Sequence, residues 1–79
     1  MKENKLSNGN TYHLTPQQMK ALNYLAQGLR NKEIANRMKL SESTIKQHVS
    51  GIMLRLGVNT RTAVVVKAQE LGLIRLTYF

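Results

Sequence analysis

The chain has 79 residues, which allows one small domain and leaves no room for a second. Twelve Lys and Arg against four acidic residues give a formal net charge of +8, which favours a polyanionic partner such as a nucleic acid or an anionic membrane surface. The absence of cysteine excludes disulfides and thiolate metal sites, and two distant histidines leave little material for a metal or catalytic cluster. We therefore expect neither an enzyme nor a cofactor.

Residues 1–13 show no periodicity of a helix or a strand. They are polar and contain the turn-forming run Asn8-Gly9-Asn10, so we predict a flexible N-terminal arm. The arm lacks the apolar core of a signal peptide, and no apolar run in the chain approaches the ~20 residues of a membrane span. We expect a cytoplasmic protein with no membrane partner.

A first helix is predicted to begin at Pro16. Thr15 can act as its N-cap, and Gln18 stands where a capping box needs its return hydrogen bond. Gly28 ends the helix near Gln27. Apolar residues recur at helical spacing along this segment, namely Met19, Leu22, Leu25, Ala26 and Leu29.

Two further helices joined by a tight turn are predicted between Asn31 and Gly57. The first runs from about Asn31 to Met38, and the connection Lys39-Leu40-Ser41 follows. Ser41 caps the next helix and Gly57 closes it. Its apolar stripe consists of Ile45, Val49, Ile52 and Leu56. This arrangement is typical of the helix-turn-helix that enters a DNA major groove.

Two residues within this third helix depart from its regular pattern. Gly51 lies in its middle and costs roughly 0.5–1 kcal/mol relative to alanine, so the helix needs tertiary support. His48 follows Ile45 by one helical turn and borders the apolar stripe. We interpret His48 as a half-buried packing residue, because the chain offers too few partners for a catalytic triad and His13 lies in the arm.

A fourth helix is predicted from its cap at Thr60 to about Leu71, with Gly72 as its stop. Val64-Val65-Val66 has strand propensity, but the cap and the stop favour a helix. The segment after Gly72 could extend the helix, fray or pair as a strand. The predicted fold is therefore an all-α, four-helix (tetrahelical) helix-turn-helix domain over residues 14–74, followed by a C-terminal tail at 75–79.

The third helix carries the strongest indication of function. Lys46, Gln47 and Ser50 lie opposite its apolar stripe, together with Ser43 and Leu54. Lysine can donate to guanine, glutamine can pair bidentately with adenine, and serine can serve several bases. We predict contacts from Lys46, Gln47 and Ser50 to DNA bases, although any one of them alone could be an ordinary surface residue.

Donors at the edges of the motif are candidates for contacts with DNA phosphates. Helix N-termini favour such contacts, because their backbone N–H groups are free to bind anions. The predicted phosphate-contacting residues are Lys32, Thr44, Arg61, Arg30 and Ser43. Further candidates are Arg37, Lys39 and Arg55.

The fourth helix has more apolar groups than one stripe can bury. Val64, Ala68 and Leu71 can face the core, which leaves other apolar residues partly outside. One possibility is that these residues add to the small hydrophobic core. The other is that they form a two-fold dimer interface, which would hold two recognition helices about one DNA turn, ~34 Å, apart. The predicted dimer interface consists of Val65, Val66, Gln69 and Leu73.

The order of these motifs resembles the LuxR/FixJ/GerE-type DNA-binding domain over residues 14–74. The resemblance rests on Leu14-Thr15, Ala21-Leu22, Gly28, Asn31 to Ala35 (NKEIA), Leu40-Ser41, Ser43 to Lys46 (STIK), His48, Ile52, Arg55 to Val58 (RLGV) and Arg61-Thr62. It implies a tetrahelical helix-turn-helix, dimerisation through the last helix and bacterial transcription regulation. It also implies base or groove contacts at Lys46, Gln47 and Ser50, and phosphate contacts near Lys32 and Thr44.

The chain departs from the family pattern at a few positions. Arg30 replaces the usual Ser or Thr cap of the second helix, which we expect to move the cap to Asn31. Leu54 stands where polar residues are common, and Ala63 stands where Glu or Gln is common. Family members usually attach this domain to a receiver or ligand-binding domain, so the chain is either a stand-alone regulator or an excised C-terminal domain.

The sequence therefore predicts a DNA-binding transcription regulator that acts as a homodimer on a partly palindromic site of double-stranded DNA. When bound to DNA it would associate with the nucleoid. Two alternatives remain open at the level of sequence. The domain could be a sigma-factor-like module that works only beside RNA polymerase, or an interaction module that sequesters a full-length family relative through its last helix.

Overall fold

The computed structural model describes residues 12–74, which fold into four helices with no strand in that range. The helices are α1 (Pro16–Ala26), α2 (Asn31–Met38), α3 (Glu42–Leu56) and α4 (Arg61–Glu70). The predicted all-α architecture is confirmed, and the three valines lie within α4. Most of the predicted arm, residues 1–11, and the tail at 75–79 lie outside the described residues, so both stay predictions.

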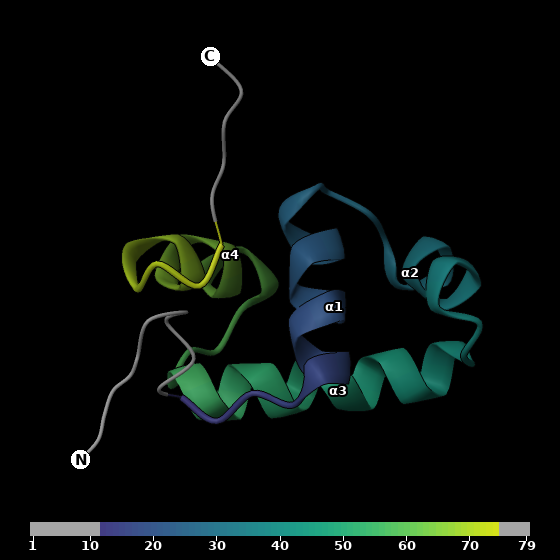
Figure 1. Ribbon diagram of the computed structural model, residues 1–79, viewed down its shortest axis with the longest axis horizontal. Coiled ribbons are helices and arrows are strands. Elements are labelled where there is room, and N and C mark those ends of the chain that lie inside the picture. The colour runs from purple at the N-terminus through teal and green to yellow at the C-terminus, as the bar shows by residue number, and fades with distance from the viewer. Residues whose placement is uncertain (1–11, 75–79) are drawn as a thin grey trace.

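The longest helix, α3, forms the base on which the other helices pack. α1 stands over its middle, α2 lies near its N-terminal end and α4 lies above its C-terminal end (Figure 1). One apolar core fills the space between them, with contributions from every helix and from both flanking segments. Its buried residues are Leu14, Ala21, Leu22, Leu25, Ile34, Ala35, Ile45, Val49, Ile52, Leu56, Val64, Ala68, Leu73 and Ile74.

Side-chain caps begin three of the helices at the predicted residues. The Thr15 hydroxyl accepts from the Gln18 backbone N–H at 3.0 Å, and the Gln18 Oε1 accepts from the Thr15 backbone N–H at 2.9 Å. This reciprocal pair is the predicted capping box. The Ser41 hydroxyl caps α3 and the Thr60 hydroxyl caps α4 in the same manner, each accepting a backbone N–H at 3.0 Å.

The expected cap of α2 is wrong, because the helix is capped at Arg30 and not at Asn31. An arginine side chain has only donors, so it cannot accept a bond from the first N–H groups of a helix. Glu33 instead reaches back and accepts the Arg30 backbone N–H at 2.8 Å. The Asn31 side chain is used elsewhere, as the acceptor of a hydrogen bond from Arg61.

Gly51 lies against the side chain of Gln18, a residue of α1. A Cβ atom built on Gly51 would lie only 2.5 Å from Nε2 of Gln18, the residue that completes the capping box of α1. Glycine thus lets the Gln18 carboxamide lie against the middle of α3. The tertiary support that α3 needs comes from its buried apolar stripe, and this contact adds to it.

All four helices end in a Schellman motif, in which one left-handed residue turns the chain and the next residue bonds back to the helix. The left-handed residues are Gly28, Lys39, Gly57 and Gly72, with φ between 59° and 87°. The residues that follow them donate to carbonyls five positions earlier, at 2.9–3.2 Å. Those residues are all apolar and pack on or within the core, namely Leu29, Leu40, Val58 and Leu73.

The last of these motifs corrects the prediction for Leu73. Leu73 was expected to lie partly outside as a dimer-interface residue, but only 7% of it is exposed. Its backbone N–H bonds to the Ala68 carbonyl at 2.9 Å, which folds the chain back after Gly72 and brings the side chain into the core. Leu73 therefore stabilises the domain and offers little surface to a partner.

Candidate nucleic-acid interface

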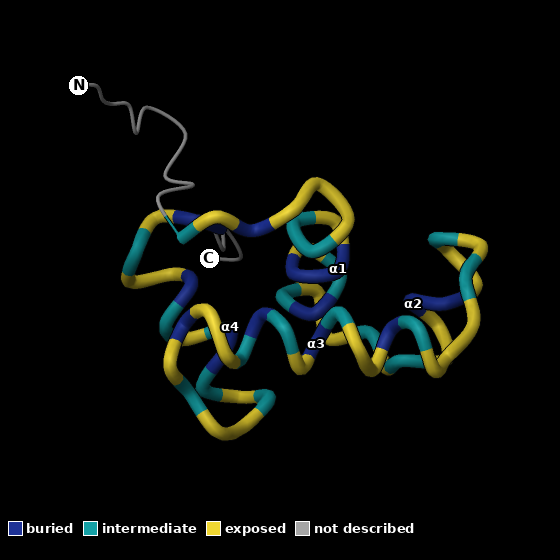
Figure 2. The backbone as a smooth tube through the Cα atoms, turned by 90° about the horizontal axis from the view of Figure 1, so that it is seen from below, coloured by how far each residue is buried: buried dark blue, intermediate teal, exposed yellow. Residues whose placement is uncertain are grey.

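α3 has one buried face and one polar face. Ile45 and Ile52 are fully buried in the core, and Val49 is 8% exposed. The predicted base-contacting residues Lys46, Gln47 and Ser50 are all exposed, and the helical period places them within one sector of the opposite side. Seen from below, exposed and buried segments alternate along α3 (Figure 2). The structure thus brings the three predicted donors together on one accessible surface.

The first turns of α2 and α3 add further donors. Lys32 is exposed in the first turn of α2, and Arg30, the residue that precedes the helix, is exposed as well. Ser43 is exposed at the start of α3, while Thr44 is half-buried with its Oγ1 at 2.9 Å from the Ser41 Oγ. Both first turns also present backbone N–H groups at the positive end of a helix, where anions bind favourably.

Arg61 makes an internal contact that the sequence did not indicate. Its Nη1 donates to the Asn31 Oδ1 at 2.6 Å, and its Nη2 donates to the Leu29 carbonyl oxygen. The predicted phosphate donor therefore joins the start of α4 to the segment between α1 and α2. A cation in the first turn of a helix interacts unfavourably with the helix dipole. The position of Arg61 at the start of α4 therefore suggests that its side chain has a partner, but it does not identify that partner.

His48 is half-buried beside the apolar stripe of α3, as predicted for a packing residue. Within residues 12–74 no cluster of three or more His, Cys, Asp or Glu side chains could hold a metal ion. The helices in this range are also too short or too polar for any of them to cross a membrane.

The outer surface of α4 retains exposed apolar area. Val66 is 51% exposed, Val65 is half-buried and Gln69 is exposed. On α3, Leu54 is 80% exposed, although it follows the polar residues Gln47 and Ser50 along the same side of the helix. Large apolar side chains that remain accessible on a small domain are typical of contact surfaces.

Comparison with known proteins places this geometry in a group of DNA-binding regulators. Residues 12–68 match the family described as bacterial regulatory proteins, luxR family. The chain is 47% identical over 58 residues to the DNA-binding transcriptional activator DevR/DosR of Mycobacterium tuberculosis, covering 73% of this chain and 27% of that protein. It is 40% identical over 53 residues to the nitrate/nitrite response regulator protein NarP of Escherichia coli, covering 67% and 25%.

A solved structure shares the fold as well. The transcription factor GerE superposes with a TM-score of 0.70 at 29% identity, over 75% of this chain and 88% of that one. The chain spans about a quarter of the length of these two curated relatives. The similarity therefore concerns one domain of those longer proteins.

Proposed function

Because this chain belongs to the luxR family of bacterial regulatory proteins and has the helix-turn-helix domain with which that family binds DNA, we propose that α3 enters the major groove of a specific operator. The observation that supports this proposal most directly is the polar face of α3. There, Lys46, Gln47 and Ser50 are accessible while the opposite stripe is buried in the core. In the groove, Lys46 donates to guanine, Gln47 pairs with adenine and Ser50 contacts a neighbouring base.

The donors around this face would fix the position of the domain on the duplex. Lys32, Arg30, Ser43 and Thr44 lie at the starts of α2 and α3, where backbone N–H groups also favour phosphate. Arg61 holds the start of α4 near the start of α2 and has further N–H donors that can face a phosphate. In the cell, the bound domain would be associated with the nucleoid.

We further propose that two copies bind a partly palindromic site through the outer surface of α4. Val65, Val66 and Gln69 provide the accessible area for this contact, whereas Leu73 is withdrawn into the core. A two-fold arrangement presents two α3 helices to successive major grooves about 34 Å apart.

Selection of bound sites from random double-stranded DNA with the purified chain tests the proposal. We expect an enriched sequence with two related half-sites about one helical turn apart. If no sequence is enriched, autonomous operator recognition is contradicted, and a module that binds DNA only beside RNA polymerase becomes the better explanation.

The variant Lys46→Ala tests base recognition on the selected site. It should weaken specific binding by about 1–3 kcal/mol and weaken binding to unrelated DNA much less, because a lost base contact matters only at the correct base. Fluorescence anisotropy with both duplexes measures the two losses. Equal losses on both would rule out a base contact at Lys46.

The matched variant Lys32→Ala removes the same charge from a proposed phosphate contact. It should weaken binding to both duplexes similarly and reduce the slope of log K against log salt by about one unit. An unchanged salt slope would contradict a phosphate contact at this position.

A further inference from the structure

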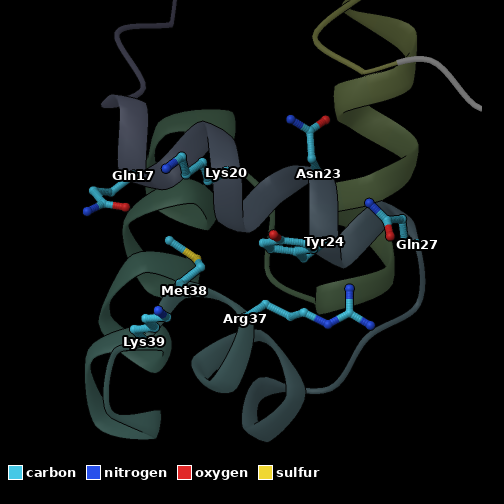
Figure 3. A pocket seen from close by; sticks show the side chains of 8 residues that line it. All are labelled: Gln17, Lys20, Asn23, Tyr24, Gln27, Arg37, Met38 and Lys39. Carbon is cyan, nitrogen blue, oxygen red and sulfur yellow. The ribbon is translucent and has the colours of Figure 1, made fainter.

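An open cavity of about 510 Å³ lies on the surface between α1 and the C-terminal end of α2, and most of its lining side chains are exposed (Figure 3). Its lining comes from α1 and from residues 37–39, with no contribution from α3. Cavities of roughly 300–1,000 Å³ are typical of small-molecule sites. The cavity is therefore large enough for a small ligand and separate from the polar face of α3.

The charged side chains that line this cavity are all basic. Lys20, Arg37 and Lys39 line it, and no acidic side chain does. The negative end of the α2 dipole favours Arg37 and Lys39, but Lys20 lies in the middle of α1, where the helix dipole has little effect. All three side chains are exposed, so water screens their mutual repulsion, and together they present a positively charged lining to an anion.

The backbone of Lys39 supports a role for its side chain. Lys39 has φ 59° and occupies the left-handed position that glycine occupies at the ends of α1, α3 and α4. A side chain in that conformation is strained, whereas glycine adopts it freely. The chain keeps a lysine there, and its side chain lines the cavity.

An aromatic ring and carboxamides complete the lining. Tyr24 is half-buried and lies near the middle of the group in Figure 3, with Lys20 and Lys39 toward one end and the Arg37 guanidinium toward the other. Within residues 12–74 the Tyr24 hydroxyl has no hydrogen-bond partner. An aromatic ring can stack on a nucleobase, and the carboxamides of Asn23 and Gln27 can pair with its polar edge.

The geometry points to a second ligand site in this cavity, which binds a nucleotide. The phosphates lie against Lys20 and Lys39 at one end, the base stacks on Tyr24, and the Arg37 guanidinium at the other end binds the polar edge of the base. Because Lys39 is the first residue of the turn into α3, a bound nucleotide contacts the connection between the two helices of the motif. Arg37 and Lys39 are also candidates for DNA phosphate contacts, whereas Lys20 and Tyr24 are not, so Lys20 and Tyr24 distinguish this site from the proposed DNA surface.

Titration of the isotope-labelled chain with ADP, in the absence of DNA, tests this inference by two-dimensional NMR. We expect backbone amide shifts confined to residues 17–27 and 37–40. Adenosine and inorganic pyrophosphate should each bind at least tenfold more weakly than ADP. Shifts centred on Lys46 and Gln47, or shifts at 37–40 without shifts at 17–27, would overturn the inference, because ADP would then only imitate a DNA phosphate.

Variants separate a built site from general attraction to a basic protein. Lys20→Gln and Arg37→Gln should each weaken ADP binding about tenfold, as expected for the loss of one charge-assisted hydrogen bond. Tyr24→Leu should weaken ADP binding and leave pyrophosphate binding unchanged. The control Lys67→Gln removes the same charge from α4, outside the cavity, and should leave ADP binding unchanged.

Two results from these variants would overturn the nucleotide assignment. One is a loss in Lys67→Gln equal to that in Arg37→Gln, which would mean that net charge alone attracts ADP. The other is unchanged ADP affinity in Tyr24→Leu, which would mean that the ring does not stack on the base. Both are measured with variants at positions that lie outside the buried core.

Discussion

At the scale of single residues, the contact between Gly51 and Gln18 couples two opposing contributions to stability. Alanine at position 51 would favour the α3 helix by roughly 0.5–1 kcal/mol. Its Cβ would also displace the Gln18 carboxamide, which lies 2.5 Å from that position and accepts the Thr15 backbone N–H. The net effect of a substitution at Gly51 therefore depends on whether Gln18 is present.

We predict that Gly51→Ala changes the free energy of unfolding by less than about 0.5 kcal/mol in the native background, because the helical gain is offset by the lost half of a capping box. In a Gln18→Ala background the same substitution should stabilise the domain by about 0.5–1 kcal/mol. Urea denaturation of the four proteins measures the difference. Equal stabilisation in both backgrounds would contradict the close approach.

At this scale the sequence predicted local features well and long-range ones poorly. The caps at Thr15, Ser41 and Thr60 and the exposure of Lys46 and Gln47 follow from rules that act within one or two helical turns. The bond from Arg61 to Asn31 joins residues thirty positions apart, which no local pattern contains.

The two wrong predictions about the fold, the cap of α2 and the exposure of Leu73, also have tertiary or turn-specific causes. Arg30 caps α2 because the Glu33 carboxylate accepts its N–H, while the Asn31 side chain is already bonded to Arg61. Leu73 is buried because it follows a left-handed glycine in a Schellman motif. The sequence does contain a sign of the burial of Leu73, because an apolar residue also follows Gly28 and Gly57 at the ends of α1 and α3.

At the scale of the helices, the four Schellman motifs differ at one position. Glycine fills the left-handed site after α1, α3 and α4, and Lys39 fills it after α2. A side chain in this conformation costs roughly 1–2 kcal/mol, part of which is offset because glycine loses more entropy on folding. The turn of the helix-turn-helix is therefore less stable than a glycine would make it.

We predict that Lys39→Gly stabilises the domain by about 0.5–1 kcal/mol, measured by urea denaturation. The matched control is Gly28→Lys, which places a side chain in the left-handed site after α1. Nothing lies within 4 Å of a Cβ at Gly28, so this variant should be destabilised by a similar amount through backbone conformation alone. Destabilisation of Lys39→Gly would show that the Lys39 side chain contributes more to folding than its backbone costs.

At the scale of the whole molecule, net charge opposes the association of two copies. Each chain carries +8, so two copies repel each other at low ionic strength, and DNA phosphates would remove that repulsion. The accessible apolar area proposed for the interface is small, because Leu73 is buried and Val65 is half-buried. Pairing should therefore be weak in free solution and become favourable on two adjacent half-sites.

The variant Val66→Asp tests this cooperative pairing. Val66 is 51% exposed, so the substitution should leave the fold intact, while a carboxylate buried at the interface without a partner should cost about 1–3 kcal/mol of cooperativity. Gel shifts on duplexes with one and with two half-sites measure the two quantities separately. Affinity for a single half-site is the internal control and should change little, because α3 is untouched. Full cooperativity in Val66→Asp would place the dimer contact elsewhere, and a parallel loss on both duplexes would mean that the variant disturbs DNA binding itself.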